Sequence, residues 1–122
     1  QVKPWLPVAV EHQENSVDLQ EISPDSVLNS YRHFTQWRKQ HSALLCGDIT
    51  FVDTAEPILS FIRQDNVEKL LVCFNFSNRA QKLSLDLFSD EVFELTDHNL
   101  ITANVIDGCI TLPAFGCFYA SL

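Results

Sequence analysis

Sixteen acidic residues are the side chains of this sequence that could most readily do chemistry. Hydrolysis of a glycosidic bond, for example, needs two carboxyl groups that face each other across that bond. The candidates in the second half of the chain are Asp86, Asp90, Glu91, Glu94, Asp97 and Asp107. They fall in expected turns or on the polar side of expected strands, without aromatic or arginine neighbours that would shape a pocket. Because exposed acids are usually plain surface, we expect solvated carboxylates and turn caps here rather than an active site.

The histidines and glycines offer little for metal or phosphate chemistry. His12, His33, His41 and His98 are scattered along the chain, whereas a zinc site needs about four ligands with close pair spacing. The sequence has no G-x-S-x-G motif, and three glycines are too few for a phosphate-binding loop. We therefore expect no metal and no cofactor. A serine or cysteine nucleophile with a histidine partner remains open at this level.

The four cysteines, Cys46, Cys73, Cys109 and Cys117, form no C-x-x-C pair. Cys73 lies inside an apolar strand pattern, where a free cysteine behaves as a small hydrophobic residue. We expect four reduced thiols, as in a cytosolic protein, with disulfide pairing as the alternative.

Aromatic side chains could form a sugar-binding platform. Such platforms usually consist of tryptophan or tyrosine, and Trp5, Tyr31 and Trp37 all precede the region that resembles strands. Most of the nine phenylalanines fall at positions expected in a core. We therefore expect core packing rather than a sugar platform on the β region.

Composition narrows the class of protein and of partner. The apolar fraction of 46% and the charged fraction of 20% suit one globular domain. A net charge of −8 with only 8 basic residues argues against binding to nucleic acid or to an anionic membrane. No apolar run approaches the roughly 20 residues that span a bilayer, and the N-terminus lacks the pattern of a signal peptide. The sequence does not begin with methionine and contains none, from which we expect a processed chain or a piece of a longer one. The expected reduced thiols indicate the cytoplasm.

The first part of the chain is expected to be a linker followed by one helix. Prolines alternate with large apolar residues near the start, which favours extended chain over residues 1–22, with Trp5 packed on a surface and a polar loop over residues 11–20. Ser23 suits a helix N-cap and Pro24 the first helical position. The apolar stripe carries Leu28, Tyr31 and Phe34 at spacings of three, with Val27 and Trp37 beside it. We expect one helical unit over residues 23–47.

The remainder, residues 48–122, is expected to be a mainly β, antiparallel Greek-key β-sandwich. Short strand patterns recur with turns between them. The expected strands span residues 48–52, 58–63, 69–76, 81–87, 92–95, 109–112 and 115–120. The third is almost continuously apolar, which predicts a central strand buried on both faces. Residues 64–66 suit a hairpin turn, and Asp107-Gly108 forms another turn.

Several segments together carry a family resemblance. They read KPWLPV (residues 3–8), NSVDLQ (15–20), DSVL and YR (25–32), WR, HSAL and GDI (37–49), LLVCFNFS (70–77) and LPAFG (112–116). Their order and spacing resemble the C-terminal region of bacterial α-glucosidases of glycoside hydrolase family 13, a group that includes oligo-1,6-glucosidases. One departure is Val8-Ala9-Val10, where members of the family often have Asn-Pro.

The resemblance implies a non-catalytic part of an enzyme that hydrolyses terminal α-linked glucose from oligosaccharides. In that family the nucleophile Asp, the acid/base Glu and a third Asp lie in a (β/α)8 barrel upstream of these segments, so no catalytic residue is carried onto this chain. The helix of residues 23–47 would be the last barrel helix, and the β domain would pack against the barrel. The isolated chain would be inactive and would leave part of its apolar helix face free for self-association. A carbohydrate-binding module and a stand-alone interaction domain remain the alternatives.

Overall fold

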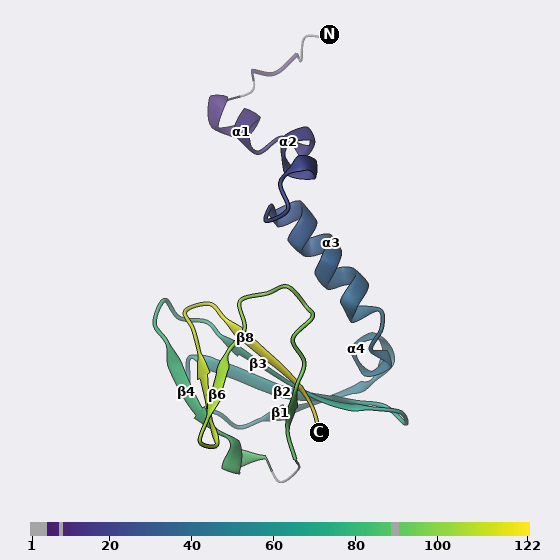
Figure 1. Cartoon of the computed structure of the whole chain (residues 1–122), viewed down its shortest axis with the longest axis vertical. Helices are drawn as coiled ribbons and strands as arrows, with labels where there is room; N and C mark the ends of the chain where they lie inside the picture. The colour runs from purple at the N-terminus through teal and green to yellow at the C-terminus, as the bar shows by residue number, and fades with distance from the viewer. Residues whose placement is uncertain (1–4, 8, 89–90) are drawn as a thin grey trace.

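The computed structural model describes residues 5–7, 9–88 and 91–122. Four helices form an arm that leads into a β domain (Figure 1): α1 (Val10–Glu14), α2 (Val17–Ile22), α3 (Val27–Arg38) and α4 (Ser42–Cys46). Helices α1 to α3 project away from the strands, and the chain returns to them at the end of α3 and in α4. None of the helices in the described ranges has the length and apolar character that crossing a membrane requires.

The β domain consists of two antiparallel sheets, which confirms the expected mainly β fold. The five-stranded sheet has the order β1-β2-β3-β8-β5, and the three-stranded sheet has the order β4-β7-β6. The strands are β1 (Asp48–Val52), β2 (Ile58–Gln64), β3 (Lys69–Asn75), β4 (Gln81–Ser84), β5 (Phe93–Glu94), β6 (Asn104–Ile106), β7 (Cys109–Leu112) and β8 (Cys117–Ser121). A 3-10 turn, η1 (Leu85–Leu87), follows β4. The Greek-key linkage stays a prediction.

Strand β3 is central and buried on both faces, as its apolar run predicted. It pairs with β2 on one side and β8 on the other, and residues 70–73 are all buried. Leu71 and Cys73 point into the core between the two sheets, whereas Leu70 and Val72 face the helices. The core between the sheets comprises Ile58, Leu71, Cys73, Leu83, Phe88, Ala103, Ile110, Leu112, Phe118 and Ala120.

Both turns expected from the sequence are present. In the β2–β3 hairpin, Oδ1 of Asp65 accepts hydrogen bonds from the backbone N–H groups of Val67 (2.8 Å) and Glu68 (2.9 Å). In the β6–β7 hairpin, Asp107 and Gly108 have φ of 50° and 71°. Positive φ at both central residues matches the twist of a two-residue hairpin, which is why Asp-Gly is favoured there.

Three strand expectations need correction. The strand over residues 81–87 stops at Ser84, because its hydroxyl accepts from the N–H of Asp86 and starts η1. The strand over residues 115–120 begins only at Cys117, since Phe115 has a φ of 54° that a strand does not allow. Strand β6 was missed. Its three residues pair only with β7, so the pattern is too short to be seen without its partner.

The helix also begins later than Ser23 and Pro24 predicted. Ser26 is the N-cap of α3, and its hydroxyl accepts from Asn29 N at 3.3 Å. The same hydroxyl donates to the carbonyl of Gln20 at 2.7 Å, which fixes Ser26 rather than Ser23 as the cap. The 23–47 unit is broken after Arg38 and resumes as the short α4.

The expected loop over residues 11–20 is wrong, because α1 and α2 occupy most of it. Contacts with α3 explain α2: the Asn29 side-chain amide donates to the carbonyls of Gln20, Glu21 and Ser23, groups that a helix end leaves without partners. Trp5 is 91% exposed rather than packed on a surface of this chain. Expectations for residues 1–4 and Val8 lie outside the described residues.

Candidate functional site

The most organised cluster of polar and aromatic side chains is where the helices meet the five-stranded sheet. We call the rings of Phe34, Trp37, His41, His98 and Tyr119 the seam. Trp37 is 5% exposed, and its ring centroid lies 5.7 Å from Phe34, 4.6 Å from His41, 5.4 Å from His98 and 5.0 Å from Tyr119. Tilted and edge-on pairs at such distances stabilise aromatic clusters beyond simple burial. The seam therefore fixes the end of α3 on the β domain.

Charged side chains clamp the short helix α4 onto the same sheet. The Glu68 carboxylate accepts from the N–H of Ala43 at 2.9 Å and contacts Nδ1 of His41 at 3.0 Å. At the other end of α4, Arg63 donates to the carbonyl of Ala43 (3.1 Å) and Arg38 to that of Leu44 (2.9 Å). Acidic groups suit a helix start and basic groups a helix end, so the clamp satisfies both termini.

His98 is fully buried in the seam. Its Nδ1 accepts from the N–H of Leu100 at 3.1 Å, which places the proton of the neutral ring on Nε2. Nε2 has no hydrogen-bond partner among the described residues. Burial lowers the pKa of His98, an effect that exceeds the opposing attraction of Glu94 and Asp97. The ring is therefore a neutral packing element.

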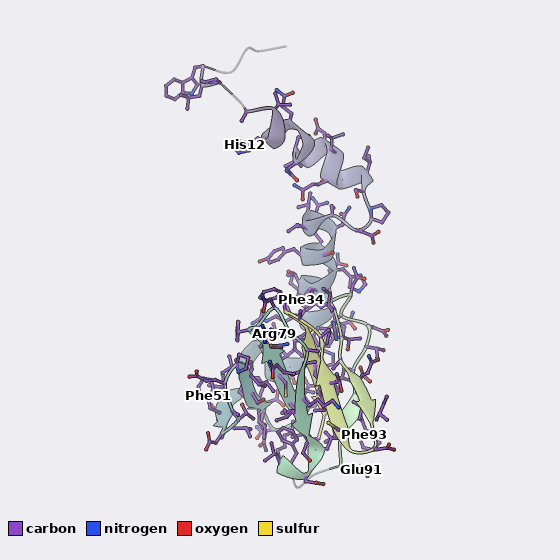
Figure 2. All side chains as sticks on the ribbon, turned by 90° about the vertical axis from the view of Figure 1, so that its left-hand side faces the viewer. His12, Phe34, Phe51, Arg79, Glu91 and Phe93 are labelled. Atoms are coloured by element: carbon purple, nitrogen blue, oxygen red, sulfur yellow. The ribbon has the colours of Figure 1, made fainter. Side chains whose placement is uncertain are left out.

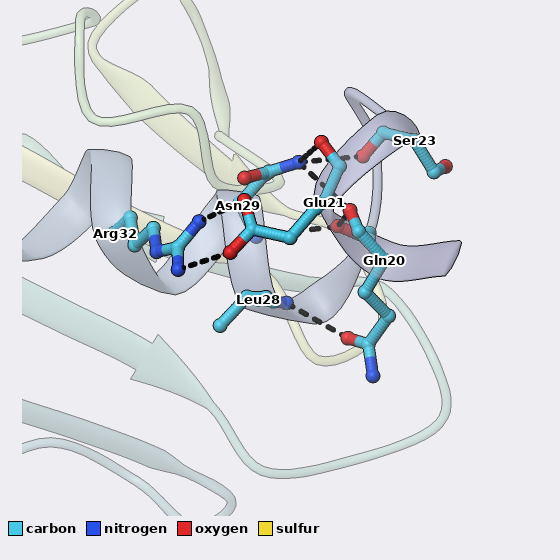
Figure 3. A network of polar contacts seen from close by, with 7 residues as sticks. Gln20, Glu21, Ser23, Leu28, Asn29 and Arg32 are labelled. Carbon is cyan, nitrogen blue, oxygen red and sulfur yellow. Dashed lines mark hydrogen bonds and ion pairs between the residues drawn. The ribbon is translucent and has the colours of Figure 1, made fainter. Parts of the chain in front are cut away.

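Helix α2 is tied to α3 by a polar network (Figure 3). Arg32 and Glu21 form a two-pronged ion pair with both N–O distances 2.6 Å, and this hydrogen bonding lowers the pKa of Glu21. The N–H of Leu28 donates to the Gln20 side chain at 3.1 Å. Beyond this network, large apolar side chains of the arm are uncovered: Val27 is 81% and Tyr31 68% exposed. The expectation that part of the apolar helix face stays exposed is confirmed, while Phe34 and Trp37 at the end of α3 pack on the β domain.

The candidate carboxylates do not assemble into a site. Asp86, Glu91, Glu94, Asp97 and Asp107 are exposed, and the structure records no contact between any two of them. Glu94 accepts from the Thr102 hydroxyl at 3.0 Å, and Asp107 lies in the β6–β7 turn. Asp90 lies outside the described residues.

The histidines and cysteines of the described residues differ in burial: His98, Cys73 and Cys117 are buried, whereas His12 and Cys46 are exposed. No group of three or more His, Cys, Asp or Glu residues there could hold a metal. All four cysteines are free. Burial raises the pKa of the thiols of Cys73 and Cys117 to about 11, which leaves both protonated and unreactive near neutral pH.

The phenylalanines depart most from expectation. Phe88 and Phe118 are buried, but Phe51, Phe76, Phe93 and Phe115 are between 59% and 68% exposed. Phe51 and Phe93 lie at opposite sides of the β domain (Figure 2). The expectation of core packing therefore holds for five of the nine phenylalanines, because Phe34, Phe61 and Phe74 also pack against a buried cluster. It is wrong for the four exposed ones, because alternation indicates which face a side chain lies on but not what covers that face.

The sequence pattern identified Trp37 and Phe34 but not the residues of the β domain that the helices contact. Tyr119 packs on both rings, and Glu68 and Arg63 bind α4. These three residues are distant in sequence from the helices, so no spacing pattern connects them with the helices. His98 was considered only as a metal ligand. One weak signal for the clamp existed: Glu68 follows the predicted hairpin turn of residues 64–66. An acidic residue near a turn is too common to indicate a contact with a distant helix.

Comparison with known proteins gives a consistent picture. Residues 58–117 match the family model described as "Alpha-amylase SusG C-terminal domain". A "Probable alpha-glucosidase" of Rhizobium meliloti (strain 1021) is 38% identical over 119 residues, which are 98% of this chain and 21% of that protein. A "Glucan 1,6-alpha-glucosidase" of Streptococcus pneumoniae serotype 4 is 33% identical over 69% of this chain and 16% of its own length. The chain thus spans about a fifth or less of these relatives.

A solved structure agrees over nearly the whole chain. The crystal structure of the α-glucosyl transfer enzyme XgtA superposes with a TM-score of 0.89 at 34% identity, over 98% of this chain and 22% of that one. The match includes the helical arm as well as the strands, because it leaves almost no residue out. The chain belongs to the α-amylase family, glycoside hydrolase family 13, of which it carries the C-terminal β domain.

Proposed function

We propose that this chain is the C-terminal part of a cytoplasmic α-glucosidase that hydrolyses terminal α-linked glucose from oligosaccharides. Its role is non-catalytic: it packs against a (β/α)8 barrel and stabilises it, and α3 (Val27–Arg38) supplies the last barrel helix. The names of the relatives support the activity, and the four free thiols support a reducing compartment.

The observation that carries the proposal is the uncovered arm. Ile22, Val27 and Tyr31 are each more than 65% exposed on helices that project away from the β domain. Contiguous apolar surface of this kind marks an interaction site. A barrel that uses α3 as one of its own helices would cover these side chains, whereas a self-contained interaction domain has no need of the arm.

The first experiment compares the 122-residue chain with a longer protein that contains it. We expect the longer protein to hydrolyse a chromogenic α-glucoside and the purified chain to show no turnover above buffer. Turnover by the chain itself would contradict the non-catalytic role. We also expect the isolated chain to self-associate through the arm, as measured by sedimentation velocity.

The second experiment tests the arm as the contact. Val27→Gln and Tyr31→Gln place a good helix former at these positions and should lower the thermal stability of the longer protein. At concentrations where the isolated chain is monomeric, they should leave its thermal stability nearly unchanged, because both side chains are exposed in the single chain. Val67→Gln, 84% exposed at the β2–β3 turn, is the control. Silence of both arm variants in the longer protein would refute the barrel contact.

A further inference from the structure

The outer face of the five-stranded sheet, the face turned away from the core between the sheets, is only partly covered. Phe51, Phe61, Val72 and Tyr119 lie directly opposite one another across β1, β2, β3 and β8. The seam buries Val72 and Tyr119 to 4% exposure or less, whereas Phe51 is 65% exposed. The cover provided by α3 and α4 therefore ends near β2.

Four rings run across the uncovered part, and we call Phe51, Phe61, Phe74 and Phe76 the aromatic row. Successive ring centroids are 6.1, 6.1 and 6.2 Å apart. Both ends of the row, Phe51 and Phe76, are about two thirds exposed. Pro57 and Leu59 extend the apolar surface beside Phe76, around an open hollow of about 400 Å³.

The aromatic row is continuous with the seam. A hollow of about 180 Å³ between α3 and the sheet is lined by Phe34, Arg38, Leu44, Phe61, Arg63, Val72 and Tyr119, so it joins the row to the covered half. Phe61 and Phe74 already pack against the buried cluster of the seam. Arg38 and Arg63 supply positive charge at this junction, in a chain whose net charge is −8.

Backbone hydrogen bonding favours a helix over an extended segment as the occupant of this face. The strand backbones below it are paired within the sheet, so an extended segment lying on the face would find no partners for its own N–H and C=O groups. A helix satisfies those groups internally. Strands are about 4.8 Å apart, so β1 to β3 span roughly 10 Å, the diameter of one helix.

A sugar suits the face less well. Successive rings of the row are inclined by 69°, 42° and 47°, so they form ridges and grooves rather than a flat platform. Ridges and grooves interdigitate with side chains of a helix. The described residues around Phe76 include one charged side chain, Glu56, and are otherwise apolar.

We propose that the aromatic row is the docking site of one amphipathic helix from the same polypeptide, outside these 122 residues. Its apolar stripe covers Phe51, Phe61, Phe74 and Phe76, and an acidic side chain of it faces Arg38 and Arg63. This inference rests on the proposed function, because the occupant comes from the part of the protein that this chain does not include. Relatives about five times as long have chain enough to supply it.

The test uses the longer protein with Phe51→Thr and Phe76→Thr. Phe51 lies in β1, where threonine keeps strand propensity, and Phe76 lies just after β3. Each of these exposed rings contacts a neighbouring ring of the row, so the urea midpoint of the isolated chain should fall much less than the stability of the longer protein. Burial of a phenylalanine side chain shifts the equilibrium between the docked and the undocked helix by about tenfold or more. When the protease cleaves only the undocked form and reclosing is fast, the cleavage rate follows this equilibrium. Native-state proteolysis of the longer protein should therefore become about tenfold faster in each variant. Ile106→Thr, at 68% exposure on the other sheet, is the matched control and should change nothing.

The outcomes separate this inference from the proposed function. Unchanged proteolysis in both row variants, with the arm variants still destabilising, overturns the docking helix and leaves the barrel contact standing. If neither the row variants nor the arm variants change the longer protein, both the docking helix and the barrel contact are overturned. Saturable binding of maltotriose that Phe51→Thr abolishes would make the row a sugar surface and overturn the helix.

Discussion

Acidification should weaken the β domain through His98. The ring is buried against Trp37 and Tyr119, and its Nδ1 accepts from the N–H of Leu100. A proton on Nδ1 would point at that N–H, so the bond would be lost and a charge would be buried. The charged groups that act on the ring are Glu94 and Asp97, which favour its protonation, and His33, which opposes it.

The sign and the upper limit follow from linkage. The pKa of His98 is lowered by burial in the folded state, whereas an unfolded histidine titrates near about 6.5. The unfolded chain therefore binds the proton more readily, and the stabilisation is complete above that value and lost as the pH falls below it. One proton gives at most about 1.4 kcal/mol per pH unit, so the loss at pH 5.5 is at most about 1.4 kcal/mol relative to neutral pH.

The assay is urea denaturation at pH 7.5 and pH 5.5. His98→Asn removes the titrating group, and an asparagine side chain can accept from the N–H two residues on. Its free energy of unfolding should fall between the two pH values by about 1 kcal/mol less than that of the original protein. His12→Asn, at an exposed position on the arm, should keep the original pH dependence. An equal loss in His98→Asn and the original protein would refute the reasoning.

Three substitutions test packing, each by urea denaturation at pH 7.5. Trp37→Ala removes the centre of the seam and should cost about 3–5 kcal/mol. Asn75→Ala should cost about 2–3 kcal/mol, because the buried amide donates to the carbonyls of Arg79 and Pro113 at 2.7 and 2.8 Å. Gly47→Ala should cost about 1–3 kcal/mol, since a Cβ there would lie 2.7 Å from the carbonyl oxygens of Ala43 and Gln64. Val67→Ala, at an exposed turn, should stay within about 0.5 kcal/mol, and a substitution that costs no more than this control contradicts its stated contact.

The strands were predictable where an apolar pattern coincides with a local turn. Strands β1 and β7 have the predicted bounds, and the Asp65 side chain explains why the β2–β3 hairpin forms where it does. The apolar run of β3 correctly implied that both of its faces are buried. The hairpin is set by contacts within a few residues along the chain, whereas the burial of β3 was visible because its own sequence is apolar on both faces.

The arm shows the opposite situation. Ser23 and Ser26 are both acceptable N-caps by residue type, and the choice depends on the bond from the Ser26 hydroxyl to Gln20. Helix α2 likewise depends on the Asn29 amide. These contacts join residues six to nine positions apart across a turn, so no periodic pattern of the first 22 residues could reveal them.

The seam could be predicted only in part. The spacing of Phe34 and Trp37 indicated a buried helix face, but nothing indicated that His98 and Tyr119 would meet it from positions 61 or more residues later. The resemblance to a family added what spacing could not, namely the expectation that a barrel precedes the helix. It did not indicate which half of the sheet the helix would cover.

The two faces of the five-stranded sheet differ in how much of each is covered. Its inner face is closed by the second sheet, with residues such as Phe118 and Ile110 at 0% exposure. Its outer face is closed over Val72 and Tyr119 and open over Phe51 and Phe76. A domain designed to stand alone would carry polar side chains on that open half, since exposed apolar surface favours association. Under the docking proposal, the exposed rings continue the interface that the arm begins.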